Sequence, residues 1–191
     1  MRRPSRFRSR EGFTLAEMVI ALAVIAMLAA IILVQVANQA RRGSTAALAQ
    51  SLSGVSSAVL SFRGDVRHYP ATLTELTRPL VLGDVDACGG TLATAVRNRW
   101  AGPYLQRAVP ATGVPAGDAT ILNGLVRSPA TANPGDAGTL YIIAANVDRQ
   151  TATELEAQFD GNADFTGGSI RWVSGGAAGD TLKYAVPVTG C

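Results

Sequence analysis

The chain of 191 residues has one lysine and one histidine, and these two scarcities exclude several kinds of site. Lys183 is followed by Tyr184, so the Gly-Lys-Ser/Thr motif that holds nucleotide phosphates is absent. The single histidine, His68, rules out the His-Glu-x-x-His zinc motif, and the Gly-x-Ser-x-Gly motif of serine hydrolases does not occur. We therefore expect no enzymatic activity.

The basic excess of the chain is confined to its first residues. The formal net charge is +3, from 17 Lys and Arg against 14 Asp and Glu. Without residues 1–12, which hold five arginines and Glu11, 12 basic and 13 acidic residues remain, a net charge of −1. The rest of the chain has no basic excess of the kind that binds nucleic acid, and we predict no nucleic-acid partner.

A long apolar run follows this basic leader. Residues 18–34 contain no polar side chain. The segment 13–37 would form a helix of about 37 Å at about 1.5 Å per residue, enough to cross a hydrocarbon core of about 30 Å. The leader arginines predict a cytoplasmic N-terminus and place the remainder on the far side of the membrane.

The order of these signals is unusual. A secretory signal peptide is cut after its apolar core, whereas here a glycine precedes that core. Residues 12–17 read Gly-Phe-Thr-Leu-Ala-Glu, and they closely resemble the class III signal of type IV pilins and type II secretion pseudopilins. The resemblance implies that prepilin peptidase removes residues 1–12 by cutting after Gly12 and methylates Phe13, the new N-terminal residue.

The position of Glu17 in the apolar segment is also typical of this family. Carboxylates inside membrane helices are rare and usually functional, which argues against the alternative of an ordinary signal peptide that is discarded. In pilins the matching glutamate pairs with the methylated N-terminal amine of a neighbouring subunit, and the resemblance gives Glu17 this assembly role.

Apolar residues recur at helical spacing beyond the membrane segment. Their separations of four, three, four and three residues form one stripe, and serine and glutamine lie on the other face. We predict one helix from about Thr14 to Arg63, whose part 38–64 is amphipathic. The stripe consists of Leu48, Leu52, Val55, Val59 and Phe62.

The remaining residues, 65–191, are predicted to form a globular domain. Three segments have strand patterns: 140–147, 169–174 and 181–188. The glycine-rich linker 175–180 predicts that the last two pair as an antiparallel hairpin. The fold class is therefore α+β and pilin-like, with the long helix packed on a small C-terminal antiparallel sheet.

Two short helices are also expected in this domain. One spans 71–80, with Thr72 or Thr74 near its N-terminus. The other opens at Thr153, where Thr153 and Glu156 have the spacing of a capping box. Residues 65–136 otherwise have the composition of a variable loop region.

Two cysteines, Cys88 and Cys191, lie far apart in the chain. The predicted topology places them in an oxidising compartment, where two cysteines of a small domain usually pair. Such a bridge resembles the cysteine-bounded loop of type IV pilins. Two unpaired thiols, or a nucleophile pair of Cys88 with His68, are the alternatives, and neither residue has the local context of a nucleophile.

The segment 160–164 alternates oxygen-bearing side chains, as a calcium loop does. Its candidate ligands are Asp160, Asn162 and Asp164. The downstream acidic ligand of an EF-hand is missing, because 167–171 contains no acid. A solvated Asp/Asn/Gly turn is the alternative, and we expect no other cofactor.

The sequence thus predicts a structural subunit of a type IV pilus or a type II secretion pseudopilus. Its expected partners are prepilin peptidase, the inner membrane, an assembly platform, and copies of itself or related pilins. Tyr69-Pro70 and the segment 102–105, Gly-Pro-Tyr-Leu, resemble pseudopilins, whereas the cysteines resemble pilins. A membrane-anchored or secreted periplasmic enzyme or binding protein is the alternative function.

Overall fold

The computed structural model describes residues 12–128, 138–161, 165, 167–176 and 179–186, apart from the side chains of residues 33 and 34. The chain divides into two compact units, Met1–Arg42 and Gly43–Cys191, and the second is called the domain below. The long helix α1, Leu15–Val66, begins in the first unit and ends in the domain.

The predicted long helix is confirmed, and so is its apolar stripe. All five stripe residues are at most 5% exposed and belong to the core of the domain. The helix passes through Gly64 and ends at Val66, three residues beyond the predicted end, and Arg67 follows with φ of 67°. Continued packing explains the extension, because Val66 is fully buried in the same core.

The domain contains one antiparallel sheet of six strands in the order β1-β2-β4-β6-β5, with β3 also paired to β4. Leu140, Ile142 and Ala144 of the central strand β4 share the core with the helical stripe, so the sheet packs on the amphipathic part of α1. The strands are β1 Val114–Ala116, β2 Ala119–Ile121, β3 Val126–Arg127, β4 Leu140–Ala145, β5 Ile170–Gly176 and β6 Gly179–Val186.

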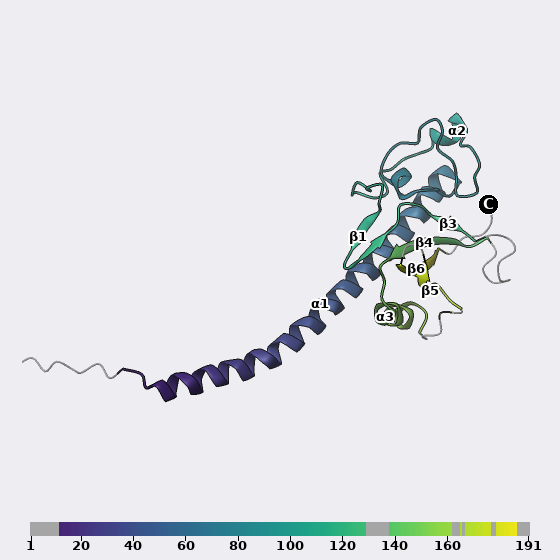
Figure 1. Ribbon diagram of the computed structural model, residues 1–191. Helices are drawn as coiled ribbons and strands as arrows, with labels where there is room; N and C mark the ends of the chain where they lie inside the picture. Colours follow the sequence, from purple (N-terminus) through teal and green to yellow (C-terminus); the bar gives the residue numbers. More distant parts are fainter. Residues whose placement is uncertain (1–11, 129–137, 162–164, 166, 177–178, 187–191) are drawn as a thin grey trace, which may run out of the picture. The chain divides into compact units, whose positions relative to one another are not determined.

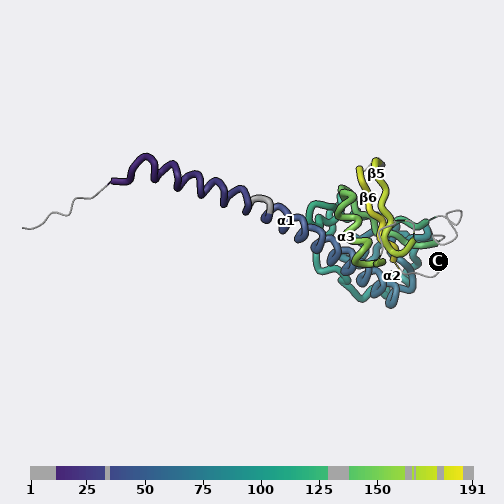
Figure 2. The backbone as a smooth tube through the Cα atoms, turned by 90° about the horizontal axis from the view of Figure 1, so that it is seen from below, coloured from purple at the N-terminus to yellow at the C-terminus, as the bar shows by residue number. Residues whose placement is uncertain are grey.

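The three predicted strands correspond to β4, β5 and β6. Figures 1 and 2 show β5 and β6 side by side, and they pair antiparallel with Trp172 opposite Leu182, as the hairpin prediction requires. No sequence pattern indicates β1, β2 and β3, which lie in the region predicted as variable loops. They are two or three residues long, too short to show alternation, and only pairing with a neighbouring strand defines them.

The predicted start of the second short helix is wrong. Helix α3 is Arg149–Phe159, and its N-cap is Asp148, whose carboxylate accepts the N–H groups of Gln150 and Thr151. Thr153 lies inside the helix and donates its hydroxyl to the Arg149 carbonyl. Because Asp148 caps the N–H groups of Gln150 and Thr151, the helix starts at Arg149, four residues before Thr153.

The first short helix is also shorter than predicted. It is a single 3₁₀ turn, η1, Leu73–Leu76, with Thr72 at its N-cap position. A longer helix would need the Leu76 carbonyl, which instead accepts the N–H groups of Tyr104 and Leu105. Pro79 has no N–H to bond the Glu75 carbonyl, and Trp100 Nε1 donates to this carbonyl instead. A second single-turn helix, α2, is Thr94–Arg97.

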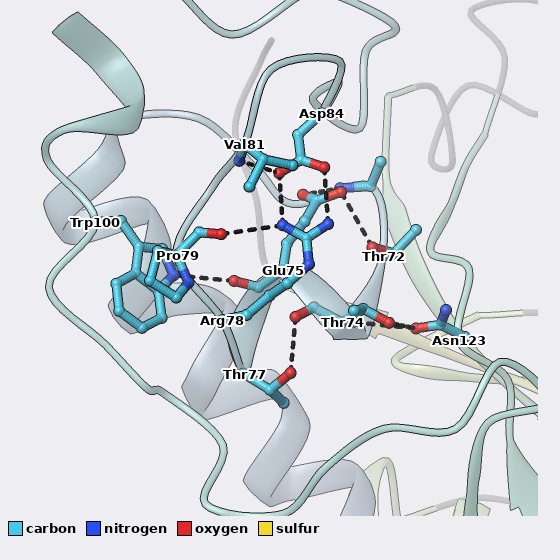
Figure 3. Close-up of polar contacts among 11 residues, drawn as sticks. Thr72, Thr74, Glu75, Thr77, Arg78, Pro79, Val81, Asp84, Trp100 and Asn123 are labelled. Carbon is cyan, nitrogen blue, oxygen red and sulfur yellow. Dashed lines mark hydrogen bonds and ion pairs between the residues drawn. The ribbon is translucent and has the colours of Figure 1, made fainter. Parts of the chain in front are cut away.

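Glu75 is a buried carboxyl group in η1, 3% exposed. It accepts hydrogen bonds from the Ala71 N–H and the Thr72 hydroxyl, both at 3.1 Å (Figure 3). Burial raises its pKa to about 7, although these two bonds act in the opposite direction. Beside it, Arg78 binds Asp84 through two hydrogen bonds of 2.9 Å, which lower the pKa of Asp84.

We predict that the protein loses stability as pH rises through 7 because of Glu75. The ordinary pKa is 4.5, so the folded state holds this proton more tightly than the unfolded state. The contribution is complete below about pH 4.5 and is lost as pH passes the folded value. At about 1.4 kcal/mol per pKa unit, the loss between pH 5 and pH 8 is on the order of 3 kcal/mol. Thermal unfolding of the detergent-solubilised chain at both pH values measures it.

Glu75→Gln is the matched control, because glutamine still accepts a hydrogen bond but does not ionise. Its melting temperature should vary less between pH 5 and pH 8 than that of the wild type. An equal pH dependence of the two proteins would assign the effect to other groups.

We also predict a bridge between Cys88 and Cys191. Cys88 is not a free thiol, whereas Cys191 lies outside the described residues. The bridge would close a loop of about 100 residues, which contributes up to about 4.7 kcal/mol in the chain-entropy model. Non-reducing peptide mapping should recover the two cysteines in one linked peptide pair, and the Cys191→Ser variant should melt at a lower temperature. Recovery of both as free thiols contradicts the prediction.

Candidate processing and assembly site

The predicted cleavage residues lie immediately before the first turn of α1. Thr14 precedes the helix, and its N–H and hydroxyl both donate to Glu17 Oε2, at 3.0 and 3.1 Å. In return, the Glu17 N–H donates to the Thr14 hydroxyl at 3.2 Å. This reciprocal pattern is a capping box, which satisfies two backbone N–H groups at the start of the helix. Glu17 therefore has a structural role within its own chain.

Gly12 and Phe13 project from this helix end. Phe13 is 84% exposed, and together with Gly12, Thr14 and Glu17 it lines a hollow of about 320 Å³. A Cβ atom added at Gly12 would have no atom within 4 Å, and the backbone there is not left-handed. Nothing in the described structure around residue 12 requires glycine.

The first half of α1 is apolar on all its faces. Within the described residues it is the one helix long and apolar enough to cross a membrane, and its most apolar window has no residue buried inside the structure. Its large apolar side chains that the structure describes, from Leu15 to Ile32 and at Val36, are more than half exposed. So much apolar surface is stable only in a membrane or against other apolar helices.

The structure describes one of the three predicted calcium ligands, Asp160. Asn162 and Asp164 lie outside the described residues. Asp160 is described, and its carboxylate accepts the backbone N–H groups of Ser169 and Ile170 at 2.7 to 2.8 Å. Among the residues that the structure describes, no group of three His, Cys, Asp or Glu side chains could hold a metal. Calcium at 160–164 stays a prediction, and it would have to share Asp160 with these N–H groups.

The alternative pair of His68 with Cys88 has no support from the geometry. His68 Nδ1 lies 2.9 Å from Asp86 Oδ2, while the other oxygen of Asp86 accepts the N–H groups of Cys88 and Gly90. Asp86 is nearly buried and organises the turn around Cys88. These contacts stabilise the loop, and Cys88 is not a free thiol that His68 could activate.

Sequence reasoning missed the role of Thr14. The signal for it was present, because Thr14 and Glu17 have the Thr-x-x-Glu spacing of a capping box directly before an apolar run. The family resemblance assigns Glu17 one role, which is to pair with another subunit. The structure adds that the same carboxylate bonds to the residue next to Phe13, where cleavage would create a new amine.

Comparison with known proteins gives one match, at this end of the chain. No curated protein and no solved structure matches the chain significantly. The match covers residues 7–33 and is to the model of the prokaryotic N-terminal methylation motif. This motif implies processing by prepilin peptidase and assembly into pilus-type filaments, and it is typical of structural proteins. The chain therefore has the cleavage and methylation signal of type IV pilins and pseudopilins at residues 7–33.

Proposed function

We propose that the chain is a structural subunit of a type IV pilus or a type II secretion pseudopilus. Prepilin peptidase cuts after Gly12 and methylates Phe13, and the mature chain then assembles through α1 with copies of itself or related pilins. The observation that supports this best is the methylation motif at 7–33, which ends within a helix whose most apolar window is not covered by any described part of the chain.

Before assembly the subunit lies in the bacterial inner membrane, with its N-terminus in the cytoplasm and the domain in the periplasm. The five leader arginines support this orientation, because basic residues remain on the cytoplasmic side. From there an assembly platform moves the subunit into the filament, where neighbouring helices replace lipid around residues 15–36. Both kinds of filament require these same steps.

The surroundings of Gly12 support cleavage at this bond. The glycine has open space around it and an unstrained backbone, so its lack of a side chain serves the peptidase and not the fold. Glu17 supports the assembly step, because its carboxylate lies at the helix end where cleavage creates the Phe13 amine. In the filament it pairs with the methylated amine of a neighbouring copy, and in a low-dielectric core each charge needs the other.

A membrane-anchored or secreted periplasmic enzyme or binding protein is the competing function. N-terminal sequencing of the mature chain separates the two, because the filament subunit must begin at Phe13 with a methylated amine. A mature chain that begins after the apolar segment would contradict the proposal.

We predict that Gly12→Val blocks processing. A branched side chain at the cut obstructs the extended chain in the peptidase, while the open space around residue 12 means that the fold of the variant is unchanged. Intact-mass measurement of membrane fractions should find the precursor with residues 1–12 still attached. Gly12→Ala adds only a methyl group, and its processing should be intermediate. Normal maturation of Gly12→Val would refute cleavage at this bond.

We predict that Glu17→Val is inserted and cut after Gly12 but assembles poorly. Removing a carboxylate favours insertion into the bilayer, whereas the partner amine in the filament is left without its counter-charge. The amount of sedimentable polymer, measured beside the amount of processed subunit, gives the result.

Glu17→Gln separates the two roles of Glu17. Glutamine serves equally well in a capping box but has no charge to offer an amine. If the charge pair drives assembly, Glu17→Gln fails as Glu17→Val does. Wild-type polymer from Glu17→Gln would show that capping, and not the charge pair, is what assembly requires.

A further inference from the structure

One loop of the domain presents a cluster of exposed apolar side chains. Leu82 is 87% exposed, Val81 is 52% exposed, and Val85 is close beside them in sequence. The other exposed large apolar residues in the described part of the domain, Leu60, Val126 and Val173, are less exposed than Val81 and are single positions on separate elements. Clustered exposed apolar residues mark interaction sites, whereas single ones need no explanation.

The loop holds this apolar tip in a fixed shape. Residues 81–84 form a turn in which the Asp84 N–H donates to the Val81 carbonyl, and the Asp84 carboxylate accepts the Val81 N–H at 2.7 Å. Arg78 binds the same carboxylate through two bonds (Figure 3). Gly83, with φ of 99°, allows the turn to close behind Leu82. A surface that is already ordered loses little conformational entropy on binding.

A groove on another part of the domain has the size and character to receive such a tip. It lies between α1 and the end of α3 and has a volume of about 510 Å³. A Cβ added at Gly54 would meet nothing within 4 Å, so the floor of the groove is open. None of its lining residues is charged: they are Ala46, Ala49, Gln50, Ser53, Gly54, Ser57, Gln158 and Phe159.

Neither of the two surfaces has an unpaired charge. The charged residues beside the tip, Arg78 and Asp84, neutralise each other, and the groove contains no charge. The contact would therefore bury apolar surface without removing an unpaired charge from water. The tip loop leads into α2, and α2 and α3 lie at opposite ends of the domain (Figure 1), so a tip meets this groove in a second copy of the chain.

We propose that the Val81–Leu82 tip of one subunit inserts into the α1–α3 groove of the next. The contact joins two different surfaces, and such head-to-tail contacts continue from copy to copy into open helical assemblies instead of closed dimers. This inference rests on the proposed function as a filament subunit. It adds a specific contact between domains, separate from the helix packing and from the pairing of Glu17.

Cysteine cross-linking in the full-length chain tests the contact. Leu82→Cys is combined with Gln158→Cys in the groove, and the control combines Leu82→Cys with Ala157→Cys. Ala157 and Gln158 are both exposed neighbours on α3, but only Gln158 lines the groove. Mild oxidation of assembled material should give a ladder of multimers with the Gln158 pair and much less with the Ala157 pair. Processing at Gly12 is measured in every variant.

A ladder specific to the Gln158 pair supports the proposal. Equal cross-linking of both pairs, a discrete dimer from Leu82→Cys alone, or no cross-link despite normal polymer each overturns it; the last outcome leaves lipid or another protein as the partner of the tip. In all three cases normal cleavage and normal polymer would leave the proposed function standing, since only the contact has failed.

A second measurement does not depend on cross-linking. Leu82→Asp brings an unpaired charge to the uncharged groove and should lose most of its polymer, while Leu82→Met should retain it. The exposed position of Leu82 leaves the fold of either variant unchanged. Wild-type polymer from Leu82→Asp contradicts the proposal.

Discussion

The domain depends on the burial of one apolar stripe of α1. Leu52, Val59 and Phe62 are completely inaccessible to solvent, and β4 supplies Ile142 and Ala144 to the same core. Each such side chain contributes roughly 1.5 to 3 kcal/mol on burial. The remaining strands and loops pack around this helix–sheet contact.

The same helix has a second, different requirement in its first half. There the apolar residues cover every face and find no partner within the described chain, so they require a membrane or neighbouring helices. The capping box of Thr14 and Glu17 fits both settings. It satisfies N–H groups that lipid cannot bond, and it holds a carboxylate next to the position where cleavage creates an amine.

Polar contacts shape the region between α1 and the sheet. Asn123, Trp100 and Tyr104 bind the backbone of η1 and confine it to one turn. The Asp84 carboxylate accepts the Val81 N–H, the Asp86 carboxylate accepts the N–H groups of Cys88 and Gly90, and each holds a tight turn. These bonds fix the loop that presents Leu82, and they enclose Glu75, whose carboxyl group is buried as a result. In this way the region gains a defined surface with little regular secondary structure.

Much of this protein was predictable from local patterns. Charge order, the position of Gly12 before an apolar run, and helical periodicity are properties of neighbouring residues, so the long helix, its buried stripe and the N-terminal methylation signal followed from the sequence. The strands β4 to β6 were long enough to show an apolar β-rich run or alternation. The N-terminal signal was also the part that a family model matched.

Other features exist only because distant residues meet. The strands β1 to β3 are defined by their pairing, and η1 is short because the Tyr104 and Leu105 N–H groups bind its Leu76 carbonyl. The burial of Glu75, the rigid exposure of Leu82 and the groove beside Gly54 likewise depend on elements far apart in the chain. Local propensity specifies none of these, because hydrogen bonds and packing between separate segments determine which groups are covered and which remain exposed.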